Sequence, residues 1–361
     1  MADHGAMSIL PTIDEAKIEA FANQIVTDVG AALATALVAV GDRLGLYRAM
    51  ADGQPVSAAE LAGRTGTQER YIREWLNAQA AGGYVTYDPE QDAYTLPAEH
   101  AFVLADETSP VALAGMFQSA VAVIDSREKV AERFVDGGGV GWHQHSHELF
   151  EGTARGFGAK YRASLVQEWL PALDGVVERL ERGGRVADIG CGHGISSILI
   201  AQAFPDATVV GFDYHADSIA AAREEAEKAG VADRVRFEIA GADGYGGQRY
   251  DLIAFFDSLH DMGDPVAAAR HARAALADGG KVMLVEPYAN DRIEDNLNPV
   301  GRVYYGFSTL VCTPGALSQG ATALGTQAGE GALREVMLAG GFGSVRRAAE
   351  TPFNLVLEAR A

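Results

Sequence analysis

The sequence predicts an α/β fold, with a parallel sheet in the second half of the chain and mostly helices in the first half. Two observations carry this prediction. After about residue 180, short apolar runs alternate with helical patterns, as in consecutive βαβ units. Before residue 100, apolar residues recur mainly at helical intervals. With 361 residues and 48% hydrophobic composition, the chain is long enough for two domains with sizeable cores.

The most informative segment runs from Val186 to Gly194, where an apolar stretch ends in Asp188 and then has glycine at every second position. A helix-forming run, 195–201, follows at once. A strand, a glycine turn and a helix in this order present backbone N–H groups to a ligand. A dinucleotide fingerprint of the G-x-G-x-x-G/A type needs a small residue at position 195. The chain has Ile195 there, which disfavours an NAD-dependent oxidoreductase.

Further strand patterns follow along the chain. Residues 208–213 end in Asp213, roughly 20 residues after the glycines, where a carboxylate can accept both hydrogen bonds of a ribose diol. Residues 234–243 form a third strand pattern that ends in Asp243. Four more patterns complete the predicted sheet, and the last two predict a closing antiparallel pair: 250–257, 281–286, 344–349 and 354–359.

Together these patterns resemble the class I S-adenosylmethionine (SAM) dependent methyltransferases over about residues 155–361. D-x-G-x-G-x-G, from Asp188 to Gly194, is similar to the first motif of that family. The resemblance implies a Rossmann-like, seven-stranded sheet with SAM as cofactor and S-adenosylhomocysteine as product. It also implies that Asp243 contacts the adenine amino group, with the residue before it beside the ring. The cofactor-binding residues that it implies are Asp188, Gly190, Cys191, Gly192, Gly194, Asp213, Tyr214, Ala242, Asp243, Phe256 and Asp257.

Composition narrows the possible partners and the compartment. The net charge of −20 disfavours nucleic acids and anionic membranes through long-range repulsion. Two cysteines imply no disulfide framework, and residues 1–5 show no signal-peptide pattern. No run approaches 18 apolar residues without charges, so we expect no membrane span. A cytoplasmic enzyme is the simplest interpretation.

The front of the chain, residues 1–100, predicts a mostly helical, winged-helix-like domain. Two helices are expected within 13–50, the second over 32–50. Ser57 and Glu60 form a capping-box pattern, a further helix follows over 68–81, and residues 84–96 suggest a hairpin. In several families of small-molecule methyltransferases, which this order resembles, such a domain serves dimerisation. The resemblance therefore implies a homodimer.

A plain packing role and DNA binding are the alternatives for this domain, and the charges argue against DNA binding. Between residues 57 and 100 there are three arginines and seven acidic residues, whereas DNA binding needs a basic face. The helix in the recognition position also carries an apolar stripe that a fold would bury: Tyr71, Ile72, Trp75 and Leu76.

The connecting segment, residues 101–180, predicts helices and a lid. It contains three alternating histidines, His143, His145 and His147, for which three interpretations stay open: a metal site, a substrate-facing loop and a solvated loop. No carboxylate or cysteine has a characteristic spacing to them, so we expect no metal, and His143 is a candidate substrate residue. Tyr161, just before the cofactor domain, is another candidate, because related enzymes place residues there that close over the cofactor.

The candidate catalytic residues follow the fourth strand pattern, in the turn Leu259-His260-Asp261. Ligands of an open α/β sheet lie outside the carboxyl ends of its strands. The L-H-D-x-x-D pattern resembles a stretch of small-molecule O-methyltransferases in which the histidine is the general base. A phenol, with a pKa near 10, is a poor nucleophile at neutral pH, and histidine titrates in the range needed to remove its proton.

We therefore predict His260 as general base with Asp261 as the neighbouring acid. Asp257 and Glu286 remain possible partners, and a positioning or structural role for His260 stays open. The cofactor domain is expected over 181–361, with an insertion of about 287–330 that forms part of the acceptor pocket. Within this insertion Tyr304 and Tyr305 are candidate substrate residues, with burial in the core as the alternative.

The predicted function is SAM-dependent methyl transfer to a small, aromatic metabolite, with O-methylation favoured. Two alternatives remain: a ligand-sensing winged-helix regulator, and a SAM-fold enzyme that catalyses a non-methylating reaction. The sequence does not identify the acceptor.

Overall fold

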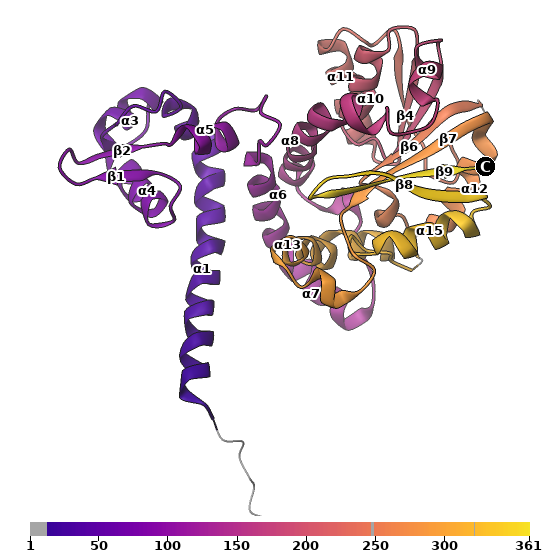
Figure 1. Cartoon of the computed structure of the whole chain (residues 1–361). Coiled ribbons are helices and arrows are strands. Elements are labelled where there is room, and N and C mark those ends of the chain that lie inside the picture. Colours follow the sequence, from indigo (N-terminus) through magenta and orange to yellow (C-terminus); the bar gives the residue numbers. More distant parts are fainter. Residues whose placement is uncertain (1–12, 247–248, 321) are drawn as a thin grey trace, which may run out of the picture. The chain divides into compact units, whose positions relative to one another are not determined.

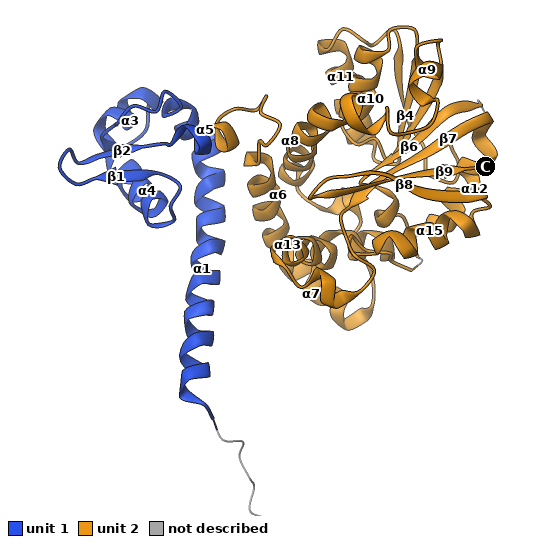
Figure 2. Cartoon of the chain, in the orientation of Figure 1, with its two compact units in different colours: residues 1–101 blue, residues 102–361 orange. Residues whose placement is uncertain are grey.

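The structure is a computed structural model, and it describes residues 13–246, 249–320 and 322–361. It divides into two compact units, residues 1–101 and 102–361 (Figure 2). The unit boundary lies within helix α5 (Ala98–Leu104). The finer boundary expected near residue 180 stays a prediction, and the expectation about a signal peptide concerns residues 1–5, outside the described residues.

The first unit is mainly helical and carries one two-stranded sheet (Figure 1). Its elements before α5 are α1 (Glu15–Arg43), α2 (Leu46–Ala49), α3 (Ala58–Thr65), α4 (Glu69–Ala81), β1 (Thr86–Asp88) and β2 (Ala93–Thr95). Ser57 caps α3 in the predicted capping box, since its hydroxyl accepts from the N–H of Glu60 and the Glu60 carboxylate accepts from the N–H of Ser57. The strands β1 and β2 pair in antiparallel fashion, so the predicted hairpin is confirmed.

The prediction of two helices within residues 13–50 is wrong in one respect, because α1 is continuous for 29 residues. Gly30 does not interrupt it. The alanines that follow Gly30 have the strongest helix propensity, which outweighs the cost of one glycine, about 1 kcal/mol. The helix α1 also meets the length and composition of a membrane span, with a mean hydropathy of 1.6 over 18 residues, of which 11% are buried. The sequence prediction of no membrane span looked for long apolar runs without charges, and single charged residues interrupt this segment.

The apolar stripe of α4 is mostly buried, as expected. Ile72, Trp75 and Leu76 pack inside the unit, and the Trp75 ring meets Tyr47 edge to face. Tyr71 differs from the prediction, because 80% of its surface is exposed. The turn of the helix places Tyr71 outside the stripe that the other three residues share.

The second unit is built around one seven-stranded sheet with the order β5-β4-β3-β6-β7-β9-β8. Neighbours among the first five strands are parallel, whereas β9 is antiparallel to both β7 and β8. The strands are β3 (Arg185–Ile189), β4 (Thr208–Asp213), β5 (Val235–Ile239), β6 (Tyr250–Phe256), β7 (Leu276–Pro287), β8 (Ser344–Glu350) and β9 (Asn354–Arg360). The predicted Rossmann-like sheet, including its closing antiparallel pair, is therefore confirmed.

Helices cover both faces of this sheet (Figure 1). Along β6, Leu252 and Ala254 point to one core, whereas Ile253 and Phe255 point to the other, as the alternation of a strand requires. The first core packs against α9 (Val176–Leu180), α10 (Ile195–Ala203) and α11 (Ala216–Lys228). The second packs against α12 (Pro265–Ala275) and α15 (Gly329–Ala339). Strands buried on both faces are nearly continuous apolar runs, which is why these strands could be predicted from the sequence.

The remaining helices lie before β3, between β6 and α12, and between β7 and α15. They are α6 (Ala114–Asp125), α7 (Arg127–Asp136), η1 (Trp142–Gln144), α8 (His147–Ser164), η2 (Leu165–Trp169), η3 (Leu259–Asp261), η4 (Ile293–Asn296), α13 (Pro299–Phe307), η5 (Ser308–Cys312) and α14 (Thr313–Leu317). Glycines let α6 and α8 approach closely. A Cβ on Gly115 would lie 2.7 Å from the backbone of Gly156, and one on Gly152 would lie 2.7 Å from Ser119.

Candidate active site

The glycine loop after β3 is tight at both ends and open in the middle. Gly190 and Gly194 have φ angles of +75° and +77°, and added Cβ atoms would lie 2.7 Å from Ser258 and 2.4 Å from Phe237. Glycine is therefore required at both positions. Gly192 also has a positive φ, but nothing lies within 4 Å of its Cβ position. The middle of the loop is thus the part that a ligand can approach closely.

Asp188 supports this loop from behind. Its side chain is fully buried and accepts hydrogen bonds from the hydroxyls of Ser196 and Ser197 at 2.6 and 2.7 Å. Burial raises the pKa of Asp188 to about 6, although the serine hydrogen bonds act in the opposite direction. Asp188 is not among the residues that line the cavity described below. It ties the end of β3 to the first turn of α10.

Asp213 lies at the end of β4 and faces the same loop. One carboxylate oxygen accepts from the N–H of Gly192 at 3.0 Å, and the other accepts from the N–H of His215 at 2.9 Å. Burial raises the pKa of Asp213 above its usual value. Each oxygen keeps a further lone pair, so the carboxylate can still accept hydrogen bonds from a diol.

A cavity of about 490 Å³ lies at the carboxyl ends of the strands in the second unit. It joins the glycine loop to α6, α8, α13 and η5. The predicted residues that line it are Gly190, Cys191, Gly192, Asp213, Tyr214, Ala242, Asp243, Phe256, Asp257, His260, Asp261, Tyr161 and Tyr304. Four others do not line it: Asp188, Gly194, His143 and Tyr305. Gly194 instead packs against Phe237, and His143 is exposed.

Asp257 and Tyr161 form a buried polar group at one wall. The Tyr161 hydroxyl donates to Asp257 at 2.8 Å, and the Asn354 amide donates to the other oxygen at 2.9 Å. Asp257 has a φ of +48°, in the left-handed region that non-glycine residues rarely adopt. Burial raises its pKa to about 6, while Lys160 nearby lowers it. No sequence pattern pointed to Asn354, which is distant along the chain and lies in β9.

His260 lies in η3 and is almost fully buried, with carboxylates at both ring nitrogens. Its Nδ1 donates to Glu286 at 2.5 Å, and its Nε2 lies 3.3 Å from Asp261. Glu286 is itself held by the N–H of Leu259 at 2.9 Å. Burial alone would lower the pKa of His260, but Asp261 and Glu286 outweigh it and hold this pKa well above its usual value. Glu286, at the end of β7, therefore holds Nδ1 of the ring, and Asp261 lies at Nε2.

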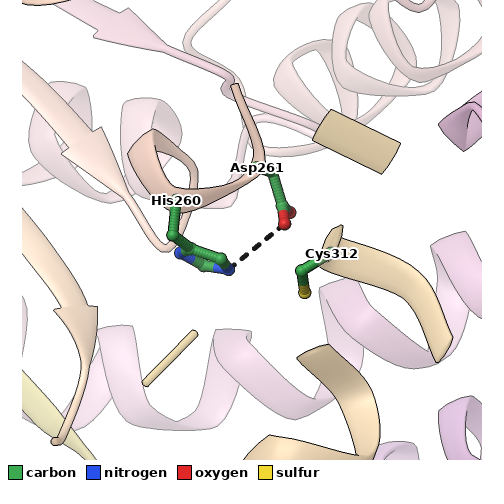
Figure 3. A group of neighbouring side chains, drawn as sticks. All are labelled: His260, Asp261 and Cys312. Carbon is green, nitrogen blue, oxygen red and sulfur yellow. Dashed lines mark ion pairs between the residues drawn. The ribbon is translucent and has the colours of Figure 1, made fainter. Parts of the chain in front are cut away.

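Cys312 completes a cluster with His260 and Asp261 (Figure 3). Their nitrogen, oxygen and sulfur atoms lie within 4.8 Å of one another, a geometry that could hold a metal ion. Metal ligands must be deprotonated. Burial raises the pKa of the Cys312 thiol to about 12, and His260 favours its protonated form. Both the thiol and the imidazole therefore favour their protonated forms, which do not bind a metal ion. The absence of a metal, expected from the sequence, stays a prediction.

Aromatic side chains line the cavity next to this cluster, and one of them, Phe150, also lies 4.9 Å from the ring of His215, which follows Asp213 and Tyr214. Trp142 and Phe150 lie with ring centroids 4.9 Å apart, and both line the cavity. Phe157 and Phe307, from α8 and α13, also line it. Of the three alternating histidines, His145 alone lines the cavity. Sequence reasoning missed Trp142 and Phe150, because apolar residues in helices give the same pattern whether they line a pocket or a core.

Comparisons with known proteins agree with this geometry. Residues 31–106 match the Rv2258c-like winged HTH domain, and residues 180–321 match a methyltransferase domain. The 27-O-demethylrifamycin SV methyltransferase of Amycolatopsis mediterranei is 37% identical over 107 residues, which are 29% of this chain and 39% of that protein. Methyltransferase GfsG of Streptomyces halstedii is 29% identical over 137 residues, 37% of this chain and 48% of that protein. The chain thus spans less than half the length of these relatives.

Two solved structures share the fold over nearly the whole chain. The mitomycin 7-O-methyltransferase MmcR is 20% identical with a TM-score of 0.68, covering 96% of this chain and 100% of that one. Human N-acetylserotonin methyltransferase, solved in complex with SAM, is 14% identical with a TM-score of 0.63, covering 98% and 99%. The fold is therefore that of two-domain methyltransferases of class I.

The family resemblance is thereby confirmed. This chain carries an N-terminal Rv2258c-like winged HTH domain followed by a methyltransferase domain.

Proposed function

We propose that this protein is a SAM-dependent methyltransferase that methylates a hydroxyl group of a small aromatic metabolite, with His260 as general base. The observation that carries the proposal is that one cavity joins three features: the open glycine loop, a buried histidine that is paired with a glutamate, and several aromatic side chains. The loop can bind a methyl donor, the histidine can accept a proton, and the aromatic side chains can hold an aromatic methyl acceptor.

The residues at the first end fit SAM. Gly192 leaves open space where a ligand approaches the backbone, and Asp213 offers carboxylate lone pairs for a ribose diol. Asp243 and Ala242 line the same cavity where an adenine amino group and ring would lie. SAM, when bound, supplies a methyl group that is already activated by its sulfonium.

The residues at the second end orient the acceptor and receive its proton. Glu286 holds Nδ1 of His260, so the histidine can present Nε2 as the base only when the ring is neutral. A hydroxyl that approaches Nε2 then transfers its proton there as it becomes a better nucleophile. Glu286 stabilises the imidazolium that results. Trp142 and Phe150 supply apolar walls that exclude water and hold an aromatic ring.

An assay with methyl-labelled SAM tests this proposal. The acceptors are panels of phenols, amines and carboxylic acids, with the product identified by mass spectrometry. We expect transfer to phenols. Isothermal titration with SAM and S-adenosylhomocysteine provides the binding control. Absence of binding to both would sink the proposal, whereas binding without transfer to any panel would favour the non-methylating alternative.

We propose further that the first unit forms a homodimer through α1. Its exposed apolar residues recur at helical spacing along one face: Ile18, Phe21, Ile25, Val29 and Leu33. The occupant we propose is a second copy of the chain, as in the winged-helix methyltransferases that this chain resembles. The net charge of −20 disfavours an anionic membrane.

Light scattering coupled to size-exclusion chromatography tests this dimer. The intact chain should have the mass of two copies, and the double variant Phe21→Glu, Val29→Glu should have the mass of one. Flotation of the intact chain with zwitterionic or anionic vesicles would contradict the proposal and assign α1 to a membrane. The regulator alternative predicts a shift of duplex DNA at low salt, which the acidic charge of the first unit disfavours.

A further inference from the structure

His145 carries a buried nitrogen for which the proposed mechanism has no use. The side chain is 8% exposed and lines the cavity, and its Nε2 has no hydrogen-bond partner among the described residues. A buried polar atom without a partner is costly, so such atoms in native structures usually indicate a missing ligand or water. The tautomer of His145 determines whether this nitrogen would donate a hydrogen bond to a ligand or accept one from it.

The hydrogen bonds around Ser126 favour one tautomer of His145. The Ser126 hydroxyl has a single proton and lies 3.3 Å from the carbonyl of Ala122, one turn back in α6, which can only accept. The same oxygen lies 3.0 Å from Nδ1 of His145. Both contacts are hydrogen bonds only when the hydroxyl donates to Ala122 and accepts from Nδ1, so we assign the ring proton to Nδ1 and the lone pair to Nε2. Burial lowers the pKa of His145 to about 4, and Lys129 nearby acts in the same direction, so the ring stays neutral at neutral pH.

The position of His145 places this acceptor beside the proposed acceptor site. Asp261, which lies next to His260, is near enough to act on the pKa of His145. Trp142 lies against His145 at a ring-centroid distance of 6.4 Å and lines the same cavity. An aromatic ligand held by Trp142 and Phe150 would therefore have His260 and His145 as two separate polar contacts.

We propose that His145 Nε2 is a specificity contact that accepts a hydrogen bond from a second donor group on the methyl acceptor. The acceptor class is then an aromatic compound with a hydroxyl or N–H group in addition to the hydroxyl that is methylated. This inference rests on the proposed function for the identity of the site. Ser126 is a positioning residue, which acts by fixing the tautomer of His145.

Ligand binding to the chain saturated with S-adenosylhomocysteine tests the proposal without turnover. The probes are the dihydroxynaphthalene isomers and the hydroxymethoxynaphthalenes that match them, in which the second group can accept but not donate. We expect at least one dihydroxy isomer to bind about tenfold more tightly than its methoxy partner, the effect of one buried hydrogen bond with its acceptor left unpaired.

Three variants assign that difference to His145. His145→Phe should abolish it, His145→Gln should restore part of it through its amide oxygen, and Ser126→Ala should reduce it by freeing the tautomer. His147→Phe is the matched control, because His147 is exposed, does not line the cavity, and keeps its edge contact with Phe150 as phenylalanine. Unchanged S-adenosylhomocysteine affinity and melting temperature would show that His145→Phe is folded.

The possible results separate this inference from the proposed function. A tenfold preference that His145→Phe removes supports the inference, even if no phenol is methylated and the proposed function fails. No preference in the intact chain, or a preference that persists in folded His145→Phe, overturns the inference. If phenols are still methylated in that case, the proposed function stands without it.

Discussion

The two ends of the cavity are built in different ways. The glycine loop of the cofactor end is local in the sequence, because β3, the loop and α10 follow one another within 19 residues, 185–203, and Asp213 and Asp243 lie at or after the ends of the next two strands. The acceptor end brings together α6, α8, η3 and η5, which are separated by long stretches of chain. The first is largely backbone geometry, whereas the second is side-chain chemistry. A cofactor loop of this kind can therefore be predicted from local sequence, whereas the proposed acceptor site depends on how distant helices pack.

Replacement of His260 should have the largest effect. We expect His260→Ala to lower kcat by about 10²–10⁴-fold, because proton removal by a positioned base contributes this much. Glu286→Gln should lower kcat less, since the ring keeps a hydrogen-bond partner at Nδ1 but loses the charge that stabilises the imidazolium. Steady-state kinetics with a phenolic acceptor measures both.

SAM affinity is the control for these variants, because neither side chain belongs to the glycine loop. Unchanged SAM affinity by titration would confine the effect to the acceptor end. If His260→Ala methylates phenols at the normal rate, alignment of the acceptor supplies the catalysis and the base assignment is wrong.

The cofactor end should be most sensitive at Gly194. We expect Gly194→Ala to lower SAM affinity by at least about tenfold and to destabilise the chain by about 1–3 kcal/mol, from strain at φ +77° and the contact with Phe237. Gly175→Ala is the matched control, with φ +71° and nothing within 4 Å. Thermal melting and titration with SAM separate the two causes, since equal losses in both variants would mean that strain alone acts.

The features that could be predicted from the sequence divide in the same way. All seven strands of the sheet were predicted, and the clearest patterns were the central strands β3, β6 and β7, which are apolar runs buried on both faces. The loop glycines and Asp213 were predicted with them, since their spacing is fixed by one strand and one turn. Glu286 was only one of three possible partners of His260, because pairing across strand ends depends on sheet order. His145 was considered only as one of the three alternating histidines, for which a metal site and a substrate-facing loop stayed open, and Trp142 was not named as a site residue, since the packing of distant segments places both.

The pH dependence should separate the two acids at His260. A base is active only when unprotonated, so below the pKa of His260 the rate should rise about tenfold per pH unit and level off above it. Because Asp261 and Glu286 raise this pKa, the rise should continue above pH 6.5. Asp261→Asn removes one raising charge and should shift the inflection to lower pH.

The expected shift is checked by measuring kcat/KM against pH for the intact chain and for Asp261→Asn, with the same phenol. Ionisation of the phenol itself, near pH 10, is common to both profiles and cancels in the comparison. An inflection that does not move in Asp261→Asn would show that Asp261 has no part in the proton balance of His260.

The adjacent tyrosines of α13 should give the smallest effects and the finest comparison within the acceptor end. Tyr304 is buried, lines the cavity, and donates to the carbonyl of Phe353 at 2.8 Å, whereas Tyr305 is half-buried and does not line the cavity. Tyr304→Phe removes the donor and leaves the Phe353 carbonyl without it, so we expect a loss of about 1 kcal/mol in unfolding free energy and a modest rise in acceptor KM. Tyr305→Phe should change the unfolding free energy and the acceptor KM by less than about half of the changes in Tyr304→Phe. Equal effects on KM would mean that both rings contact the acceptor, and that the side chains at this end rearrange when it binds.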